Sequence, residues 1–318
     1  YPSEIIAPLA ISMESILIGD QQQLPPFELR EIGTSLTKVI DNCLSAGSRD
    51  ANTLTNLSIA PWVLGDLSED ERLEFIARMF EETVPWLQPF STMYDSMAKS
   101  TDFLDGQFRM FRELSDAVGS IFYGNPFNWR KGEIGGNRIP ENELPAPWIE
   151  RGRLLIIDHS HCSVSNRGEE PSKGGTIRNI AEAETAGSLL TSLLEGGFEA
   201  KAITPYLGQV EAIQSNTPIE FRDHVTTVDA FQGKEADFII LSMVRNNRKT
   251  GARRRWGFMT YPPRLNVALS RAKEGLVLVT SVQQIEETDW EEERNHLSLF
   301  HDNVKQFGCV ISSTEIGG

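Results

Sequence analysis

Polar and charged side chains gather in the loop TTVDAFQGKEAD, at residues 226–237. Gly233 allows the backbone to approach a ligand closely, while Asp229, Lys234 and Glu235 supply charged groups. The apolar letters FIILSMV follow directly, so the pattern predicts a loop leading into a strand buried in a parallel sheet. Loops at the edge of such sheets are where α/β proteins bind ligands. A solvated turn before a core strand is the structural alternative.

Arginine is the other residue type here that suits phosphate chemistry. The segment 101–123 predicts a helix that begins near Arg109 and ends before Gly124. The planar, five-donor guanidinium of an arginine in a cleft suits a phosphoryl group in transfer, whereas a surface ion pair is the simpler interpretation. A second helix is predicted from Pro263 to Lys273, with a buried apolar stripe that leaves Arg271 projecting near its edge.

Strands and helices alternate through the second half of the chain. Strands are predicted at 154–157, 200–204, 238–244 and 276–280, and a helix at 177–195 that a Gly-Gly pair stops. Alternation of this kind predicts an α/β protein with a parallel sheet and right-handed crossovers.

The first part of the chain has a different pattern. Residues 13–18 predict a short buried strand, which GDQQQLPP ends. Apolar residues then recur at helical spacing, and we interpret 28–89 as a helical insertion. The predicted domains are therefore 1–27, the insertion 28–89, and 90–318.

Charge is distributed unevenly along this acidic chain, whose net charge is −15. The segment 245–255, RNNRKTGARRR, carries six basic residues and no acid, whereas EETDWEEE at 286–293 carries six acids and no base. A local basic segment suits a phosphate backbone, and Trp256 could stack or make a cation–π contact. A solvated charged loop is the structural alternative.

Cysteine content and hydropathy limit the class of protein. Three widely spaced cysteines argue against a disulfide framework and predict a reducing compartment, the cytoplasm or the nucleus. No apolar run is long enough to span a membrane, and no secretory leader is visible. The residues Asp158, His159, His161 and Cys162 suggest a zinc site, but a closed site needs four ligands and no matching pair occurs elsewhere. The chain starts at Tyr1 rather than Met, so we expect it to be part of a longer protein.

Five motifs in one order resemble those of superfamily 1 helicases of the up-frameshift and senataxin type. They are GDQQQLPP at 19–26, QFRM at 107–110, ITPYLGQ at 203–209, the loop at 226–237 and RLNVALSRAK at 264–273. The resemblance covers residues 1–26 and about 90–310. It implies a RecA-like parallel sheet flanked by helices, the second lobe of a P-loop NTPase fold, with the helical insertion added.

The resemblance implies an ATP site shared between two lobes. Arg109 and Arg271 would contact the γ-phosphate, and Gln23 would sense it. Phe108, in place of the family's tyrosine, would stack on the base, since phenylalanine keeps the stacking face. Gly233 and Glu235 would approach the ribose and phosphates.

The resemblance also implies contacts with single-stranded nucleic acid, RNA or DNA. Thr204, Pro205 and Tyr206 would touch the backbone, and Thr227 with Asp229 would help to couple that strand to the nucleotide. The basic segment adds three further candidates, Arg253, Arg254 and Arg255.

Part of the machinery for phosphoryl transfer is missing from the sequence. No G-x-x-x-x-G-K-[ST] phosphate loop occurs, and the family's magnesium-binding acidic motif would fall just ahead of Tyr1. ATP and Mg²⁺ would therefore be held mainly by a first lobe outside the chain, and the chain alone should hydrolyse little or no ATP. The prediction is the C-terminal part of an ATP-dependent helicase, an ATP hydrolase acting on RNA or DNA. The alternatives are a degenerate lobe that only binds nucleic acid, or a protein-interaction piece that docks a partner on the insertion.

Overall fold

The computed structural model describes residues 106–134, 136–162, 168–290 and 295–315. They belong to a compact unit that extends from Leu104 to Gly318. The strand expected at 13–18, Gln23 and the helical insertion at 28–89 lie outside the described residues.

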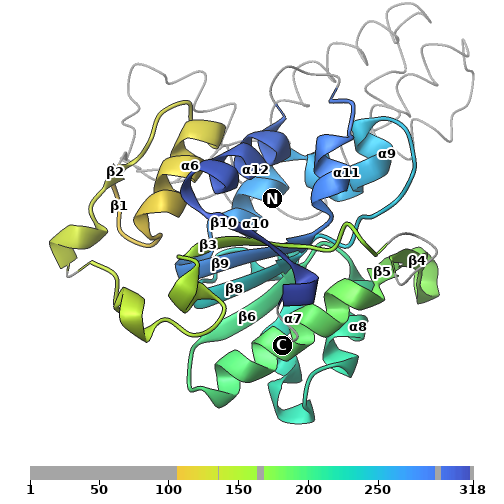
Figure 1. Cartoon of the computed structure of the whole chain (residues 1–318), viewed down its shortest axis with the longest axis horizontal. Coiled ribbons are helices and arrows are strands. Elements are labelled where there is room, and N and C mark those ends of the chain that lie inside the picture. Colours follow the sequence, from red (N-terminus) through yellow and green to blue (C-terminus); the bar gives the residue numbers. More distant parts are fainter. Residues whose placement is uncertain (1–105, 135, 163–167, 291–294, 316–318) are drawn as a thin grey trace, which may run out of the picture. The chain divides into compact units, whose positions relative to one another are not determined.

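A six-stranded sheet of parallel strands forms the centre of this unit (Figure 1). Its order is β10-β3-β9-β8-β6-β7, with the bounds β3 Leu154–Asp158, β6 Ala200–Thr204, β7 Val225–Thr227, β8 Ala236–Ser242, β9 Ala272–Thr280 and β10 Cys309–Ser312. The predicted α/β class with a parallel sheet is confirmed, and strand 200–204 has the predicted bounds.

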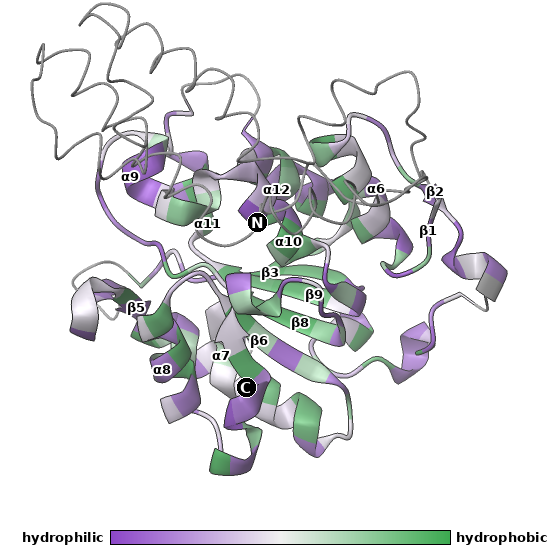
Figure 2. Cartoon of the chain, turned by 180° about the vertical axis from the view of Figure 1, so that it is seen from behind, coloured by the Kyte–Doolittle hydropathy of each residue, from purple (hydrophilic) through white to green (hydrophobic). Residues whose placement is uncertain are grey.

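Helices cover both faces of the sheet (Figure 1). One face carries α7 Ile180–Glu195 and α8 Leu207–Ser215; the other carries α6 Arg112–Phe122, α10 Pro262–Leu269 and α12 His296–Phe307. The short helices α9 Ala252–Trp256 and α11 Val282–Glu286 lie beside one another at the carboxyl side of β8 and β9. Because both faces are covered, the middle of each central strand is a run of apolar residues, and β3, β8 and β9 are mostly green in Figure 2.

Shorter elements complete the unit. Two-residue strands β1 Gly106–Gln107 and β2 Asn128–Trp129 pair in parallel, and β4 Glu169–Pro171 pairs antiparallel with β5 Ile177–Asn179. The 3₁₀ turns are η4 Lys131–Ile134, η5 Glu141–Glu143, η6 Trp148–Glu150, η7 Lys173–Gly175, η8 Ile219–His224, η9 Asp229–Phe231, η10 Gly257–Thr260 and η11 Ser313–Glu315.

The core is built on β8, all seven residues of which are buried. Phe238 packs against the ring of Trp148 with centroids 4.9 Å apart, and Gly275 lies opposite Phe238 in the register. A Cβ at Gly275 would come within 2.7 Å of the Phe238 ring, so glycine is what lets these rings fill the space.

Three predicted helix boundaries are wrong. The helix predicted over 177–195 begins at Ile180, because residues 177–179 form β5. The helix predicted over 263–273 ends at Leu269, because Ala272 pairs with Ala236 and starts β9 there. Apolar spacing over these residues fits a helix and a buried strand equally, and tertiary pairing decides. The helix predicted to begin near Arg109 begins instead at Arg112.

Candidate nucleotide and nucleic-acid sites

Arg109 lies at the amino-terminal ends of β8 and β9. Its Nε donates to Oε2 of Glu235 at 2.6 Å, and its Nη1 donates to the carbonyl of Ser270 at 3.4 Å. Glu235 directly precedes β8, while Ser270 and Arg271 form the turn before β9. The fold therefore brings together three of the predicted nucleotide-contacting positions, from three separate segments.

The turn that carries Arg109 is fixed by its neighbours. Oε1 of Gln107 accepts from the backbone N–H groups of Arg109 and Met110, at 3.1 and 2.9 Å. Nε1 of Trp129 donates to the carbonyl of Met110 at 3.0 Å. These bonds hold Arg109 outside the helix and leave 38% of its side chain exposed, with Phe108 44% exposed beside it. Both side chains are accessible to a ligand.

Arg271 differs from the sequence prediction. It was expected to project from a helix, but it lies in the turn between α10 and β9 and is only 2% exposed. Its Nε donates to the carbonyl of Val267 at 3.1 Å. The hydroxyl of the adjacent Ser270 is buried with no hydrogen-bond partner among the described residues. The turn thus places the buried side chains of Ser270 and Arg271 next to the position where Arg109 contacts the protein.

Gly233 controls how the loop reaches Glu235. Its φ is +79°, in the left-handed region that favours glycine, and the N–H of Lys234 bonds back to the carbonyl of Phe231 at 3.1 Å. Space around the glycine is open, since a Cβ there would meet nothing within 4 Å. A side chain at this position would strain the backbone rather than clash.

A buried charge cluster supports this end of the sheet. The carboxylate of Glu274, on β9, accepts from Nζ of Lys131 at 2.8 Å and from Nη1 of Arg153 at 2.9 Å, with all three side chains under 10% exposed. Burial alone would raise the pKa of Glu274. The bonds from Lys131 and from the backbone N–H groups of Arg138 and Ile139 outweigh burial and lower that pKa.

The opposite, carboxyl-terminal end of the sheet carries the nucleic-acid candidates. Thr204 ends β6 and is fully buried, Pro205 follows, and Tyr206 is the residue before α8. The hydroxyl of Tyr206 accepts from Nη1 of Arg245 at 3.2 Å. Arg245 begins the basic segment, so the TPY motif and that segment meet.

Most of the basic segment surrounds one open hollow of about 680 Å³. We call it the basic hollow; its lining is Arg245, Arg248, Lys249, Thr250, Arg253 and Arg254. Arg255 does not join them, because its Nε donates to the carbonyl of Lys249 at 2.9 Å and its Nη2 lies 3.8 Å from a carboxylate oxygen of Glu287. Arg253 and Arg254 are exposed, and five cations face one hollow.

The exposed aromatic residue near the basic hollow is not the expected one. Trp256 is fully buried and its Nε1 donates to Thr288 Oγ1 at 2.9 Å, so the suggestion that it stacks on a ligand is wrong. Phe258 is 53% exposed and lies 5.5 Å from the ring of Tyr206. The available signal was the helical spacing of three residues between Trp256 and Met259, which places Phe258 off their buried face.

A line of contacts links the loop before β8 to Tyr206. Asp229, in the loop before β8, accepts two bonds from Arg264, at 2.9 and 3.1 Å. The guanidinium of Arg264 lies over the ring of Phe258, 4.9 Å from its centroid, and that ring contacts Tyr206. Thr227 shapes the same loop, since its Oγ1 accepts from the N–H of Ala230 at 3.2 Å. Sequence reasoning assigned no role to Arg264 or Phe258.

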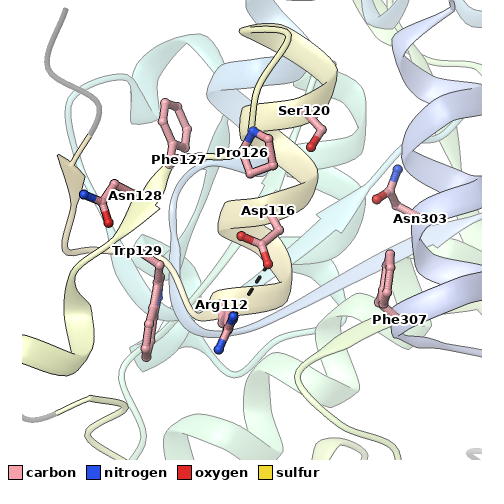
Figure 3. Close-up of a pocket in the computed structure, with 9 residues that line it drawn as sticks. All are labelled: Arg112, Asp116, Ser120, Pro126, Phe127, Asn128, Trp129, Asn303 and Phe307. Carbon is pink, nitrogen blue, oxygen red and sulfur yellow. Dashed lines mark ion pairs between the residues drawn. The ribbon is translucent and has the colours of Figure 1, made fainter.

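A second hollow, of about 590 Å³, lies between α6, α12 and the segment ending in β2 (Figure 3). Arg112 and Asp116 pair along α6 at 3.9 Å, and the rings of Phe127, Trp129 and Phe307 line the rest. Burial raises the pKa of Asp116, although Arg112 opposes the rise. No predicted site residue faces this hollow; Trp129 serves the site by holding the Arg109 turn.

The described part of the chain contains neither a candidate metal site nor a candidate membrane-spanning helix. His159, His161 and Cys162 lie close together, with the thiol 3.8 Å from His159 Nδ1 and 3.4 Å from His161 Nε2. No group of three or more His, Cys, Asp or Glu in the described ranges is arranged to hold a metal ion. Within those ranges there is also no helix of the length and apolarity needed to cross a membrane.

Comparison with known proteins connects this geometry to a family. Residues 87–283 match the family described as "AAA domain". The chain is 32% identical to "ATP-dependent helicase NAM7" of Saccharomyces cerevisiae over 226 residues, which cover 66% of this chain and 21% of that protein. It is 31% identical to "Regulator of nonsense transcripts 1 homolog" of Drosophila melanogaster over 214 residues, 64% of this chain and 17% of that protein. The chain thus spans about a fifth of the length of these curated relatives.

Solved structures give a weaker likeness. The C-terminal domain of a DNA helicase from Lactobacillus plantarum aligns with a TM-score of 0.32 and 11% identity, covering 65% of this chain and 98% of that domain. The family match, in contrast, extends over more than half of the sequence and includes four of the five motifs. The chain belongs to the AAA-domain family, among the superfamily 1 helicases of the up-frameshift type.

Proposed function

We propose that this chain is the second RecA-like lobe of an ATP-driven helicase that moves along single-stranded RNA. Residues 1–27 would be the end of the first lobe, and 28–89 an insertion. The nucleotide would lie against Arg109, Glu235 and the turn that holds Arg271, which we call the arginine corner. The RNA would run across the basic hollow.

The observation that carries the proposal is the meeting of Arg109 with the turn that holds Arg271. Two arginines from distant segments suit the negative charge that develops on a γ-phosphate in transfer, and Glu235 pairs with Arg109 when no phosphate is bound. Arg109 is accessible and can move, since its bond to Glu235 is between partly exposed groups. Arg271 is buried and lies in a fixed turn. One arginine would thus close onto the phosphate while the other supports the closed state.

The described residues fit the nucleotide better than its metal. Guanidinium donors and the buried hydroxyl of Ser270 can face phosphate oxygens. The described part of the chain offers no acidic cluster for Mg²⁺, and the sequence contains no phosphate loop. When bound, ATP with Mg²⁺ would supply the reacting phosphoryl group. This chain would orient that group and neutralise its charge.

RNA rather than DNA is proposed as the track because relatives are named regulators of nonsense transcripts. Five cations around the basic hollow suit a phosphate backbone read without sequence preference. The contacts from Asp229 through Arg264 and Phe258 to Tyr206 give a route by which phosphate release could loosen the grip on RNA.

ATPase assays on the intact parent protein test the proposal. Arg109→Ala should lower RNA-stimulated turnover by roughly 10³-fold, since such a donor acts mainly in the transition state. Arg271→Ala should lower turnover as well, because it removes the support of the closed state. Arg112→Ala is the matched control, because Arg112 is 72% exposed and, among the described residues, pairs along its own helix with Asp116 at 3.9 Å. Turnover equal to wild type in both site variants would refute the proposal. The 318-residue chain alone should show little or no turnover.

A further inference from the structure

Val244 has a backbone conformation that its side chain opposes. Its φ is +71°, and it is the one described residue other than glycine with a positive φ. The N–H of Arg245 donates to the carbonyl of Met243 at 2.8 Å, which closes a three-residue γ-turn around Val244. A β-branched residue in the left-handed region is an outlier, and this form of the γ-turn is strained. Such strain persists only where the surroundings impose it.

Side chains at the amino end of α7 hold Val244 in this strained conformation. The N–H of Val244 donates to Oε2 of Glu182 at 2.8 Å, and the carbonyl of Val244 accepts from Nδ2 of Asn179 at 3.1 Å. Both backbone polar groups of the strained residue are therefore held by side chains one helical turn apart. Asn179 also caps α7 by accepting from the N–H of Glu182 at 3.1 Å, so the clamp and the helix start are one unit.

Further buried groups keep Glu182 in place. Its Oε2 accepts a second bond from the hydroxyl of Ser242 at 2.7 Å, and Gln209 donates to that hydroxyl at 2.9 Å. Gln209 also bonds to both backbone groups of Asn179, at 2.7 and 3.1 Å. All four side chains are fully buried. Burial raises the pKa of Glu182 to about 8, which the bonds from Ser242 and Val244 partly oppose.

The turn determines where Arg245 points. Arg245 follows Val244 directly, and its guanidinium reaches the hydroxyl of Tyr206 at 3.2 Å, the carboxylate of Glu169 at 2.9 Å and the carbonyl of Arg254. These contacts connect Arg245, at the start of the basic segment, to Arg254, on the opposite side of the basic hollow. A relaxed Val244 would redirect the chain at this point and open the hollow.

We propose that Glu182 and Asn179 are positioning residues, which hold the strained γ-turn at Val244 so that Arg245 and the basic hollow are preformed for nucleic acid. Neither residue would touch the nucleic acid itself. The inference rests on the proposed function for the identity of the ligand, but the clamp itself can be tested without any ligand.

The test uses glycine as a specific rescue. Glu182→Ala removes the acceptor, so Val244 should leave the left-handed region; glycine adopts that region without being held. Glu182→Ala should speed amide exchange over 243–250 and weaken binding of a labelled oligouridylate, each by roughly tenfold, which matches the expected strain. Glu182→Ala combined with Val244→Gly should return both values to within about threefold of Val244→Gly alone. Glu182→Gln, which keeps an acceptor oxygen, should resemble wild type.

Two sets of results separate this inference from the proposed function. Unchanged exchange in Glu182→Ala, or a loss that Val244→Gly fails to restore, would overturn the clamp. Should Glu182→Ala not fold, Asn179→Ala with and without Val244→Gly applies the same test to the other bond. Arg253→Ala with Arg254→Ala should weaken oligouridylate binding and reduce the log–log salt slope by roughly 1.4, about 0.7 for each charge. Unchanged binding in that variant would overturn the proposed function, and the exchange result would still decide the clamp.

Discussion

The two ends of the parallel sheet hold buried carboxyl groups in opposite ways. At the amino-terminal end, Glu274 is surrounded by the cations Lys131 and Arg153. At the carboxyl-terminal end, Glu182 is equally buried but receives its bonds from a hydroxyl, an amide side chain and a backbone N–H. The bonds from Lys131 and the backbone outweigh burial at Glu274 and lower its pKa, whereas at Glu182 burial outweighs the bonds from Ser242 and Val244 and raises the pKa towards the neutral acid. The charged cluster around Glu274 therefore lies at the end of the sheet that carries Arg109. Glu182, with its raised pKa, lies at the end that carries the basic hollow.

The same substitution at the two ends should have very different effects on stability. Glu274→Gln leaves two buried cations without a counter-charge, so we expect the free energy of unfolding to fall by about 3–5 kcal/mol. Glu182→Gln preserves shape and a neutral state, and should lower it by less than about 1 kcal/mol. Urea unfolding of both variants measures the difference. Equal losses would show that the two ends do not differ in charge state.

The pH dependence of stability should have opposite signs at the two ends. The pKa of Glu182 is raised from 4.5 to about 8, so the folded protein keeps a proton that the unfolded chain loses between these values. Its contribution is therefore complete at low pH and is lost as pH rises towards 8, by at most about 1.4 kcal/mol per pH unit. The pKa of Glu274 is lowered from its ordinary value of 4.5, so its contribution to stability is present at neutral pH and is lost on acidification below that value.

Unfolding free energies from pH 5 to 8 for wild type and Glu182→Gln test this contrast. Wild type should lose stability relative to Glu182→Gln as pH rises through this window. Two curves that remain parallel would mean that Glu182 is already ionised in the folded protein.

The sequence predicted four of the six strands, β3, β6, β8 and β9, because each contains a short apolar run, whereas β7 and β10 received no predicted bounds. Strand 200–204 and the parallel order depend on such local signals. The Arg271 turn could not be found in this way, since the residues around Ala272 fit a helix and a strand alike. Its assignment depends on pairing with Ala236, which is distant in the sequence.

The candidate sites show the same limit. The types of residue at each site were visible as motifs, and the loop at 226–237 was correctly placed before a buried strand. However, the rule that ligands bind at the carboxyl ends of strands describes only the basic hollow. Arg109, Glu235 and Arg271 meet at the amino ends of β8 and β9. The strain at Val244 had no sequence signal, because a valine after a buried strand is ordinary.

Arg264 links the loop that leads to Glu235 with the ring of Phe258 next to Tyr206, so we expect it to couple the two candidate sites. Arg264→Ala removes two bonds to Asp229 and the cation over Phe258, without removing a residue of either candidate site. In the intact protein we expect RNA stimulation of ATPase to fall by roughly tenfold, which is about 1.4 kcal/mol of coupling. Affinities for ATP and for RNA measured separately should change by less than about threefold. A loss confined to RNA affinity would instead make Arg264 part of the RNA site.

The smallest effect is expected at the pair that closes the arginine corner. Glu235 and Arg109 are 46% and 38% exposed, so their bond at 2.6 Å contributes less than about 1 kcal/mol to folding. That bond must open before Arg109 can reach a phosphate, and Glu235→Gln weakens the competitor without changing its shape. We therefore expect ATP to bind the intact protein roughly two- to fivefold more tightly, since an ion pair of this strength is all that is lost. Weaker binding would mean that the carboxylate of Glu235 contacts the nucleotide directly, and the amino-terminal end would then contain an acceptor for the ribose as well as donors for the phosphate.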